Sequence, residues 1–420
     1  MKADLVVKNA GQLVTVAGHS KKAKRGRDLG ELAIISGGAV AVRDGLITAV
    51  GKTGAVMEQI ELTGDGRIID AGGKVVLPGL VDPHTHLVFA GSREDEFEMK
   101  IKGSAYLDIL AQGGGILSTV RSTRAAGESE LAGIGKKYLA EMLSQGTTTA
   151  EVKSGYGLTT DDELKQLRAI QALRDGQPVE LVATFLGAHA IPEEYKENPE
   201  AFVGLIIDEM LPAVSRAGLA ECCDVFCEEG VFSVEQSRRI LQAAQRRGFK
   251  LKLHADEITP LGGAELAAEL GALSADHLVA ITRQGIEKLA ASQTVAVLLP
   301  ATTFCLMGEK YAPAREMIDA GVAIALAGDF NPGSSPVNSL PVVMGIACRQ
   351  LKLTPAEALA AVTINAAHAI GRAISVGSIE VGKKADLVIF DAHDYRSIAY
   401  RLGTNLVEKV IKSGCLVVGG

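Results

Sequence analysis

The sequence predicts an α/β protein that combines a (β/α)8, TIM-like barrel with a small β-sandwich built from both chain termini. Strand-like and helical segments alternate through the middle of the chain, both ends are rich in strand-like runs, and polar side chains gather where the middle strands end. These three observations point to the same architecture. A chain of 420 residues is also too long for one small domain and suits a large barrel with a smaller module.

The two ends of the chain are expected to form β-structure. Near the N-terminus, residues 5–7 and 13–16 are short apolar runs, and residues 39–50 are expected to form a hairpin that turns at Asp44-Gly45. Three similar runs near the C-terminus span residues 385–390, 407–411 and 416–418. Because both ends share this character, we expect them to assemble into one module.

The middle of the chain is expected to supply the eight strands of a barrel. We place this barrel at residues 76–374 and the composite β-sandwich domain at residues 1–75 and 375–420. The candidate barrel strands lie at about residues 75–84, 147–153, 180–187, 222–227, 249–254, 273–277, 294–299 and 322–328. Strands that alternate with helices imply a parallel sheet, and eight such units suggest a closed barrel.

Helix starts between these strands are marked by capping boxes. Ser233 and Gln236 have this spacing, and so do Thr354 and Glu357. The helix that begins after Thr354 is expected to continue to Gly371, where glycine favours a helix end.

Composition limits the function classes. The net charge of −7 disfavours binding to nucleic acid or to an anionic membrane surface. The basic cluster at residues 21–27 is expected to be a solvated loop, with an anion-binding arm as the alternative. No apolar run approaches the ~18 residues of a membrane span. The six cysteines form no disulfide-type framework and the N-terminus lacks a secretory pattern, so a cytoplasmic setting is expected.

Five of the eight histidines fall at the ends of predicted barrel strands. His84 and His86 are two residues apart in an extended segment, so both side chains point to the same side. His254 and His277 end the fifth and sixth strands, and Asp329 ends the eighth. Active sites of such barrels lie at the carboxyl ends of the strands. Each histidine alone could be a core or surface residue, but their shared placement predicts a metal site.

Two segments resemble signatures of the amidohydrolase superfamily. Residues 78–86 (PGLVDPHTH) are similar to its first-strand motif, and residues 377–388 (GSIEVGKKADLV) to the motif of its C-terminal β-domain. Five further segments together resemble those members that hydrolyse the cyclic C–N bond of 4-imidazolone-5-propanoate to N-formimidoyl-L-glutamate in histidine degradation. They are residues 84–93, 153–158, 187–190, 254–257 and 329–333. The resemblance covers nearly the whole chain and implies the same metal-dependent hydrolysis here.

Binuclear members of the superfamily bridge two ions with a carboxylated lysine on the fourth strand. Here that strand ends in Cys227-Glu228 without a lysine, and Lys153 belongs to the second strand, where we interpret it as structural. We therefore expect one Zn²⁺ or Fe²⁺/Fe³⁺ ion per subunit. Its expected ligands are His84, His86, His254 and Asp329. A binuclear site bridged by Glu228 is the alternative. The thiols of Cys222, Cys223 and Cys227 are expected to be buried strand residues rather than zinc ligands.

Three residues are candidates for catalysis. Asp329 can orient the attacking water, and His277 can polarise the ring carbonyl or stabilise the oxyanion. Glu257, on the loop that follows His254, can deliver a proton to the leaving ring nitrogen. The sequence does not divide proton transfer among these three groups.

The substrate implied by the resemblance carries a carboxylate tail. Arg93 can hold a carboxylate bidentately, and the alternative is a surface ion pair with one of the acidic residues 94–96. Tyr156 and His189 offer hydrogen-bond donors from neighbouring loops. The other candidate substrate-binding residues are Glu257, Asn331, Gly333 and Ser334.

Competing functions stay open at this stage. A cyclic-ureide hydrolase or a nucleobase deaminase would use a similar barrel, and the His254-x-x-Glu257 spacing also occurs in deaminases. Arg93 favours an anionic tail, which free nucleobases lack. A catalytically inactive barrel that serves as a scaffold is disfavoured because the candidate ligands are all present. The expected partner is a small-molecule substrate, and the superfamily resemblance suggests a homodimer.

Overall fold

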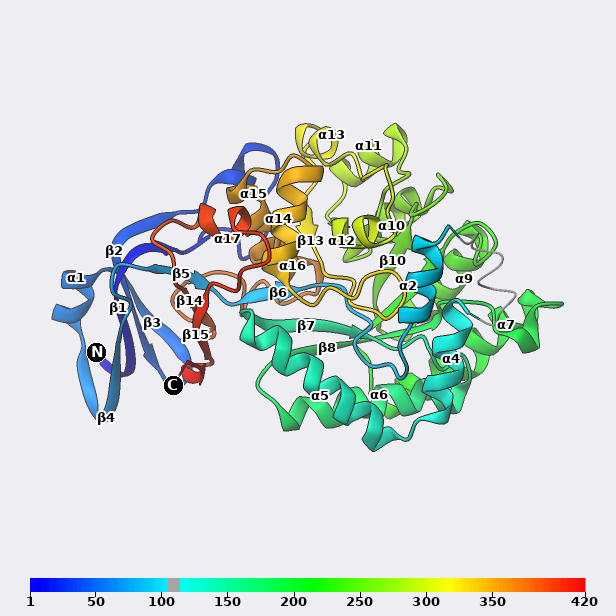
Figure 1. Cartoon of the computed structure of the whole chain (residues 1–420), viewed down its shortest axis with the longest axis horizontal. Coiled ribbons are helices and arrows are strands. Elements are labelled where there is room, and N and C mark those ends of the chain that lie inside the picture. Colours follow the sequence, from blue (N-terminus) through cyan, green and yellow to red (C-terminus); the bar gives the residue numbers. More distant parts are fainter. Residues whose placement is uncertain (104–113, 420) are drawn as a thin grey trace.

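The computed structural model describes residues 1–103 and 114–419. It contains two sheets of eight strands each, which lie at opposite ends of the molecule in Figure 1. One is the parallel sheet of a barrel wrapped by helices, and the other is a mixed sheet formed by both ends of the chain, where the N and C labels lie. The predicted combination of a (β/α)8 barrel with a β-module from both termini is confirmed.

The barrel strands follow one another in chain order around the sheet, and each pairs in parallel with the next. They are β6 (Leu80–Asp82), β7 (Thr147–Lys153), β8 (Glu180–Ala188), β9 (Cys222–Cys227), β10 (Lys250–Ala255), β11 (Ser274–His277), β12 (Val295–Leu298) and β13 (Ile324–Leu326). Just beyond β6 and β13, a parallel bridge between Thr85 and Phe330 joins the two ends of the sheet. The Asp329 N–H donates to the His84 carbonyl at 3.0 Å, and this contact brings the first and last strands together.

Helices cover the outside of the barrel. In chain order they are α2 (Glu94–Ile101), α4 (Ile116–Ala125), α5 (Glu128–Ser144), α6 (Thr160–Gly176), η2 (Glu193–Tyr195), α7 (Pro199–Leu205), η3 (Ile206–Met210), α8 (Leu211–Ala217), α9 (Val234–Gln245), α10 (Gly263–Leu270), α11 (Arg283–Ala291), α12 (Pro300–Cys305), α13 (Ala314–Asp319), α14 (Leu340–Gln350), α15 (Pro355–Ala361), α16 (Ile364–Ala369) and α17 (Arg396–Tyr400). Both predicted capping boxes are formed, at the starts of α9 and α15. None of the helices in the described ranges is long and apolar enough to cross a membrane.

The terminal sheet has the strand order β16-β15-β14-β5-β1-β2-β3, and β4 also pairs with β1. Its elements are β1 (Lys2–Val14), η1 (Gly26–Gly30), β2 (Ile34–Arg43), β3 (Leu46–Lys52), α1 (Thr53–Gln59), β4 (Glu61–Asp70), β5 (Val75–Pro78), β14 (Leu387–Phe390), β15 (Val407–Lys412) and β16 (Cys415–Val418). Val42, Ile47 and Ile389 share one buried cluster, so strands from both ends of the chain pack on each other. The predicted hairpin turns at Asp44 and Gly45, both with positive φ, as a two-residue turn requires.

Two predicted elements are each divided in the structure. Residues 75–84 were expected to form one barrel strand, but β5 pairs with β1 and β14 and only β6 belongs to the barrel. Between them, a Cβ atom at Gly79 would overlap the Thr148 side chain, so glycine lets the chain pass closely over β7 as it changes sheets. The helix expected from Thr354 to Gly371 breaks after Val362, whose carbonyl accepts from the Val81 N–H at 2.9 Å.

The basic cluster at residues 21–27 is not simply a solvated loop. Lys24 is buried and donates to the backbone carbonyls of Asp28 and Glu31 at 3.1 and 2.7 Å. Arg25 donates to the carbonyls of Ala290 and Ser292 at the end of α11, at 2.9 and 2.6 Å. A cation is favourable at a helix C-terminus, so Arg25 fastens the segment to the barrel, while Lys24 holds the segment's own backbone. The prediction of a solvated loop was wrong for them.

Candidate active site

The segment after β6 directs two imidazoles into the barrel. Thr85 lies between them and points to the neighbouring strand, where its hydroxyl donates to the Glu151 carbonyl at 2.6 Å. Because side chains alternate in an extended segment, His84 and His86 share the other side. Their Nε2 atoms are 3.3 Å apart, and both rings are buried.

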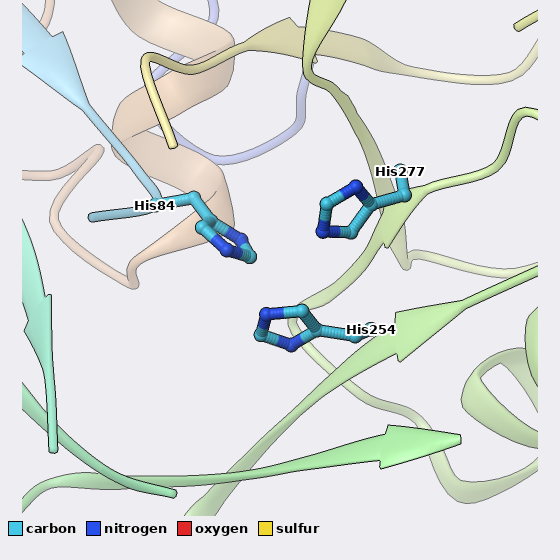
Figure 2. Close-up of side chains that lie close together, drawn as sticks. All are labelled: His84, His254 and His277. Atoms are coloured by element: carbon cyan, nitrogen blue, oxygen red, sulfur yellow. The ribbon is translucent and has the colours of Figure 1, made fainter. Parts of the chain in front are cut away.

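His254 and Asp329 reach the same point from β10 and from the segment after β13. His254 Nε2 lies 3.4 Å from His86 Nε2. Asp329 Oδ1 lies 3.4 Å from the Nε2 atoms of both His84 and His86. Figure 2 shows the rings of His84, His254 and His277 turned toward one another, and their ring centres are 4.5 to 5.4 Å apart. The structure thus brings all four predicted ligands together.

Two carboxylates and one hydroxyl contact these candidate ligands at the atoms that point away from the cluster, and so orient them. Asp276 Oδ2 accepts from His84 Nδ1 at 2.6 Å, so the Nε2 atom of His84 keeps its lone pair. Asp224 Oδ2 lies 3.0 Å from His254 Nδ1. The Thr302 hydroxyl, on α12, donates to Asp329 Oδ2 at 2.7 Å and leaves Oδ1 facing the histidines.

The donor set fits a metal ion. Burial lowers the pKa of His84 to about 3 and the pKa of His86 to about 4, so both rings are neutral near pH 7. Burial opposes ionisation of Asp329, but its contacts with His84 and His86 hold the pKa of its carboxyl well below the usual range. Metal–ligand bonds of about 2.0–2.2 Å place neighbouring donor atoms about 2.8–3.6 Å apart when the angles between them are about 90–110°. The spacings of 3.3 and 3.4 Å between these lone-pair atoms match that range.

Lys153 and Glu228 have other partners. Lys153 Nζ donates to Glu151 Oε1 at 2.8 Å and to Asp224 Oδ2 at 2.7 Å. Burial alone would lower the pKa of Lys153, but these carboxylates outweigh it and raise that pKa. The carboxylate of Glu228 accepts from the backbone N–H groups of Ile258 and Thr259, at 2.9 and 3.1 Å. Glu228 therefore holds the loop after β10, and no three-residue group that includes it could hold a metal ion in the described part of the chain.

His277 and Glu257 lie side by side at the edge of this cluster. His277 Nδ1 is 3.5 Å from Glu257 Oε1, and the buried His277 Nε2 has no hydrogen-bond partner within the described ranges. Burial raises the pKa of Glu257, while the neighbouring His277 opposes that rise. His277 also has a positive φ of 78°, a conformation that a non-glycine residue adopts only when its surroundings hold it. The imidazole of His277 and the carboxyl group of Glu257 are thus held beside the histidine cluster.

Arg93, the N-cap residue of α2, is pressed against the loop after β13. Its Nη2 donates to Glu96 Oε2 at 2.7 Å, but the Arg93 side chain is only 12% exposed, so this is not a surface ion pair. Its buried Nε has no hydrogen-bond partner in residues 1–103 or 114–419. A Cβ atom at Gly333 would overlap the guanidinium, so this glycine makes the close approach possible.

Tyr156 and His189 lie next to His86. The ring of His189 stacks on that of His86 with centres 4.8 Å apart and planes inclined by 16°. His189 Nδ1 donates to the Gly155 carbonyl at 3.0 Å, which leaves Nε2 unprotonated when the ring is neutral. The Tyr156 ring centre lies 5.9 Å from that of His86, and burial raises the pKa of Tyr156, so the phenol keeps its proton.

Asn331 and Ser334 shape the loop after β13. Asn331 Oδ1 accepts from the backbone N–H groups of Gly333 and Ser334, both at 2.8 Å. Its Nδ2 donates to the Asp329 carbonyl at 2.6 Å and to Ser334 Oγ at 2.8 Å. These contacts hold the loop that carries both Asp329 and the glycine beneath Arg93.

The chain matches the family model described as the amidohydrolase family over residues 75–417. The chain belongs to the amidohydrolase family. Within curated proteins, it is 55% identical over 418 residues to the imidazolonepropionase of Alkaliphilus oremlandii (strain OhILAs), covering 100% of this chain and 99% of that protein. It is 54% identical over 418 residues to the imidazolonepropionase of Alkaliphilus metalliredigens (strain QYMF), with the same coverage.

A solved amidohydrolase-type structure supports the fold. The chain superposes on an adenosine deaminase from Xanthomonas campestris with bound zinc at a TM-score of 0.71, with 21% sequence identity and coverage of 99% of this chain and 93% of that one. Membership of the amidohydrolase family and the His/Asp groups of the site together suit a metal ion.

Several residues of this amidohydrolase site were missed by sequence reasoning. Asp276 directly precedes His277, and strand alternation alone would place it on the face opposite to His277; it faces His84 because His277 leaves the strand with a positive φ. Thr302 lies on the helix after β12, and Glu163 lies on α6. No motif distinguishes these two from ordinary helix residues.

Proposed function

We propose that the chain hydrolyses the ring C–N bond of 4-imidazolone-5-propanoate and releases N-formimidoyl-L-glutamate. The proposal rests on full-length relatives named imidazolonepropionase at 54–55% identity. The structural observation that carries it is the buried cluster of His84, His86 and Asp329, with His254 Nε2 3.4 Å from His86 Nε2. In this reaction a water oxygen bonds to the ring carbonyl carbon, the C–N bond breaks, and the departing nitrogen takes up a proton.

The same four side chains would hold one ion, Zn²⁺ or iron. Nitrogen and carboxylate ligands with an open position suit either metal. A metal ion bound there would lower the pKa of water to about 7 and supply a nucleophile at neutral pH. The two neutral imidazoles supply the lone pairs that such an ion needs, and the hydrogen bond from Thr302 fixes the carboxylate of Asp329.

Three residues of the chain would handle the charge and the protons. Asp329 accepts a hydrogen bond from the attacking water and orients it toward the ring carbonyl. His277 Nε2, which is buried without a protein partner in the described residues, faces the cluster and can donate to the developing oxyanion when it carries a proton. The raised pKa of Glu257 favours its protonated form, which can donate to the leaving nitrogen.

The substrate's carboxylate tail would bind on the side of Arg93. The Nε of Arg93 is buried and lacks a partner within the described part of the chain, so a substrate carboxylate could accept its hydrogen bond. Tyr156 keeps its phenolic proton and can donate to the same anion or to the ring. The rest of the substrate-binding site would be formed by Glu257, His189 and the loop of Asn331, Gly333 and Ser334. Because free nucleobases have no anionic tail, this arrangement favours the propanoate substrate over a deaminase substrate.

Replacing Arg93 by methionine is expected to raise the KM for 4-imidazolone-5-propanoate about 10- to 100-fold, because charge-assisted hydrogen bonds to the tail are lost. The kcat and the metal content should change much less. Turnover can be followed by the loss of imidazolone absorbance, and metal by elemental analysis. Gly333→Ala should also raise KM, because its methyl group would displace the guanidinium.

Arg283 offers a matched control because it forms an exposed ion pair with Glu287 and its side chain is 93% exposed. Arg283→Met should leave KM unchanged. A fall in kcat alone for Arg93→Met would show that Arg93 does not anchor the tail.

The cellular setting and the assembly also stay proposals. All six cysteines are free, which supports a reducing compartment such as the cytoplasm. The homodimer follows from the superfamily resemblance, and the oligomeric mass in solution would test it.

A further inference from the structure

Residues 154–158 follow β7 and carry Tyr156, and their backbone is held by one buried carboxylate on α6. Glu163 Oε2 accepts from the Gly155 N–H at 3.1 Å. Glu163 Oε1 accepts from the N–H groups of Gly157 and Leu158, at 2.9 and 2.8 Å. The Glu163 side chain is fully buried. A carboxylate that accepts three backbone N–H groups is a strong local restraint.

The Tyr156 N–H of this segment is held by the next residue on the same face of α6, and the Ser154 N–H donates to the Thr184 carbonyl at 3.0 Å. Gln166 Oε1 accepts from the Tyr156 N–H at 3.0 Å. Gln166 Nε2 donates to the Val88 carbonyl at 2.7 Å, two residues beyond His86. Gln166 is fully buried as well. It therefore ties the Tyr156 segment to the segment that carries the two histidines.

The segment also packs closely on α6. A Cβ atom at Gly157 would come within 2.5 Å of the Glu163 backbone nitrogen, so the two backbones are in direct contact there. Leu158 has a positive φ of 56°, which a leucine adopts only when neighbouring contacts enforce it. Contacts with α6, rather than the intrinsic preferences of residues 154–158, therefore determine the conformation of this segment.

The restraint extends to His189. The Gly155 carbonyl accepts from His189 Nδ1 at 3.0 Å, and a Cβ atom at Gly155 would lie 2.9 Å from that same nitrogen. Glu163 therefore fixes Gly155, and Gly155 fixes the ring that stacks on His86. One side chain on a covering helix controls the placement of both Tyr156 and His189.

We propose that Glu163, supported by Gln166, is a positioning residue that sets the preference of the site for a substrate with an anionic tail. It acts by holding Tyr156 and His189 at fixed places beside His86, and it touches neither the substrate nor the metal ligands. The inference rests on the proposed function, because it assigns the Tyr156 hydroxyl donor and the neighbouring His189 ring to the substrate site.

Glu163→Gln in the full-length, metal-loaded protein tests the proposal. Glutamine keeps the size but places an NH₂ group against backbone donors, so the segment should shift. The KM for 4-imidazolone-5-propanoate should rise about tenfold, while kcat stays within about threefold and metal content is unchanged. Gln166→Met, which leaves the Tyr156 N–H unpaired, should shift KM in the same direction.

A pair of competitive inhibitors separates positioning from general damage. The inhibition constant of 3-(imidazol-4-yl)propanoate, which has the anionic tail, is compared with that of 4-propylimidazole, which lacks it. In Glu163→Gln the tailed inhibitor should weaken about tenfold more than the neutral one. Asp161→Asn removes an exposed carboxylate from the same helical turn and should leave both constants unchanged.

Two results would overturn the proposal. One is an unchanged ratio of the two inhibition constants in both Glu163→Gln and Gln166→Met. The other is equal weakening of both inhibitors with parallel loss of metal, which is the signature of a structural role. Failure of the proposed function is a separate result, because then the unmodified chain would not turn over 4-imidazolone-5-propanoate at all.

Discussion

His254→Ala is expected to remove bound metal and turnover together, with kcat/KM falling by about a thousandfold or more. His254 Nε2 lies 3.4 Å from His86 Nε2, and its other nitrogen faces Asp224, so the substitution removes one donor from the cluster. Metal content per chain, measured after dialysis in the same sample that is assayed, checks the prediction.

The matched control for this substitution is His393→Ala. His393 is exposed, lies on the loop after β14, and contacts the Gly73 carbonyl, far in sequence from every candidate ligand. It should retain full metal and full activity. Retention of both metal and turnover by His254→Ala would exclude His254 from the ligand set.

Glu257→Gln is expected to lower kcat about 10²- to 10⁴-fold, because an amide cannot give a proton to the departing ring nitrogen. KM should change only a few-fold and the metal content should not change, because Glu257 lies beside His277 rather than among the four candidate ligands. Steady-state kinetics with metal analysis separates these quantities.

Glu229→Gln gives the comparison for charge removal alone. Glu229 is exposed and follows the Glu228 that holds the loop of Glu257, so its loss should not slow turnover. A kcat for Glu257→Gln near that of the unmodified chain would remove Glu257 from the proton path and leave Asp329 and His277 as the candidates.

Most of the barrel could be predicted because its strands are buried on both faces and give short apolar runs bounded by turns. The boundary between the two sheets could not. Residues 75–81 carry no polar side chain, so the run was expected to form one strand, although the chain leaves the terminal sheet at Gly79. That division depends on the close approach of Gly79 to Thr148, which is a tertiary contact.

The convergence of the candidate ligands could be predicted because each lies at or just after the carboxyl end of a strand, and strand ends converge on one face of a barrel. The side chains that contact and orient these ligands could not be predicted. Asp276 and Asp224 lie within strands, where an acidic residue has no distinctive pattern until its partner is known. Thr302 and Glu163 act from helices, so their roles depend on how those helices pack against the barrel.

The basic cluster shows the same dependence on packing. Lys24 and Arg25 have the sequence pattern of a solvated loop, but both are hydrogen-bonded to backbone carbonyls. Lys24 donates to carbonyls of its own segment, and Arg25 donates to carbonyls at the end of α11. The acceptors at Ala290 and Ser292 are more than 260 residues away in the chain, as the separations of 265 and 267 show.

The most direct test is to remove metal with a chelator and add back Zn²⁺ or Fe²⁺ in steps, with turnover of 4-imidazolone-5-propanoate measured at each step. Because the proposed nucleophile is a water activated by the metal ion, activity should be absent in the metal-free chain. It should then rise linearly and level off at about one ion per chain. Full turnover by the metal-free chain, or a plateau at about two ions per chain, would contradict the account.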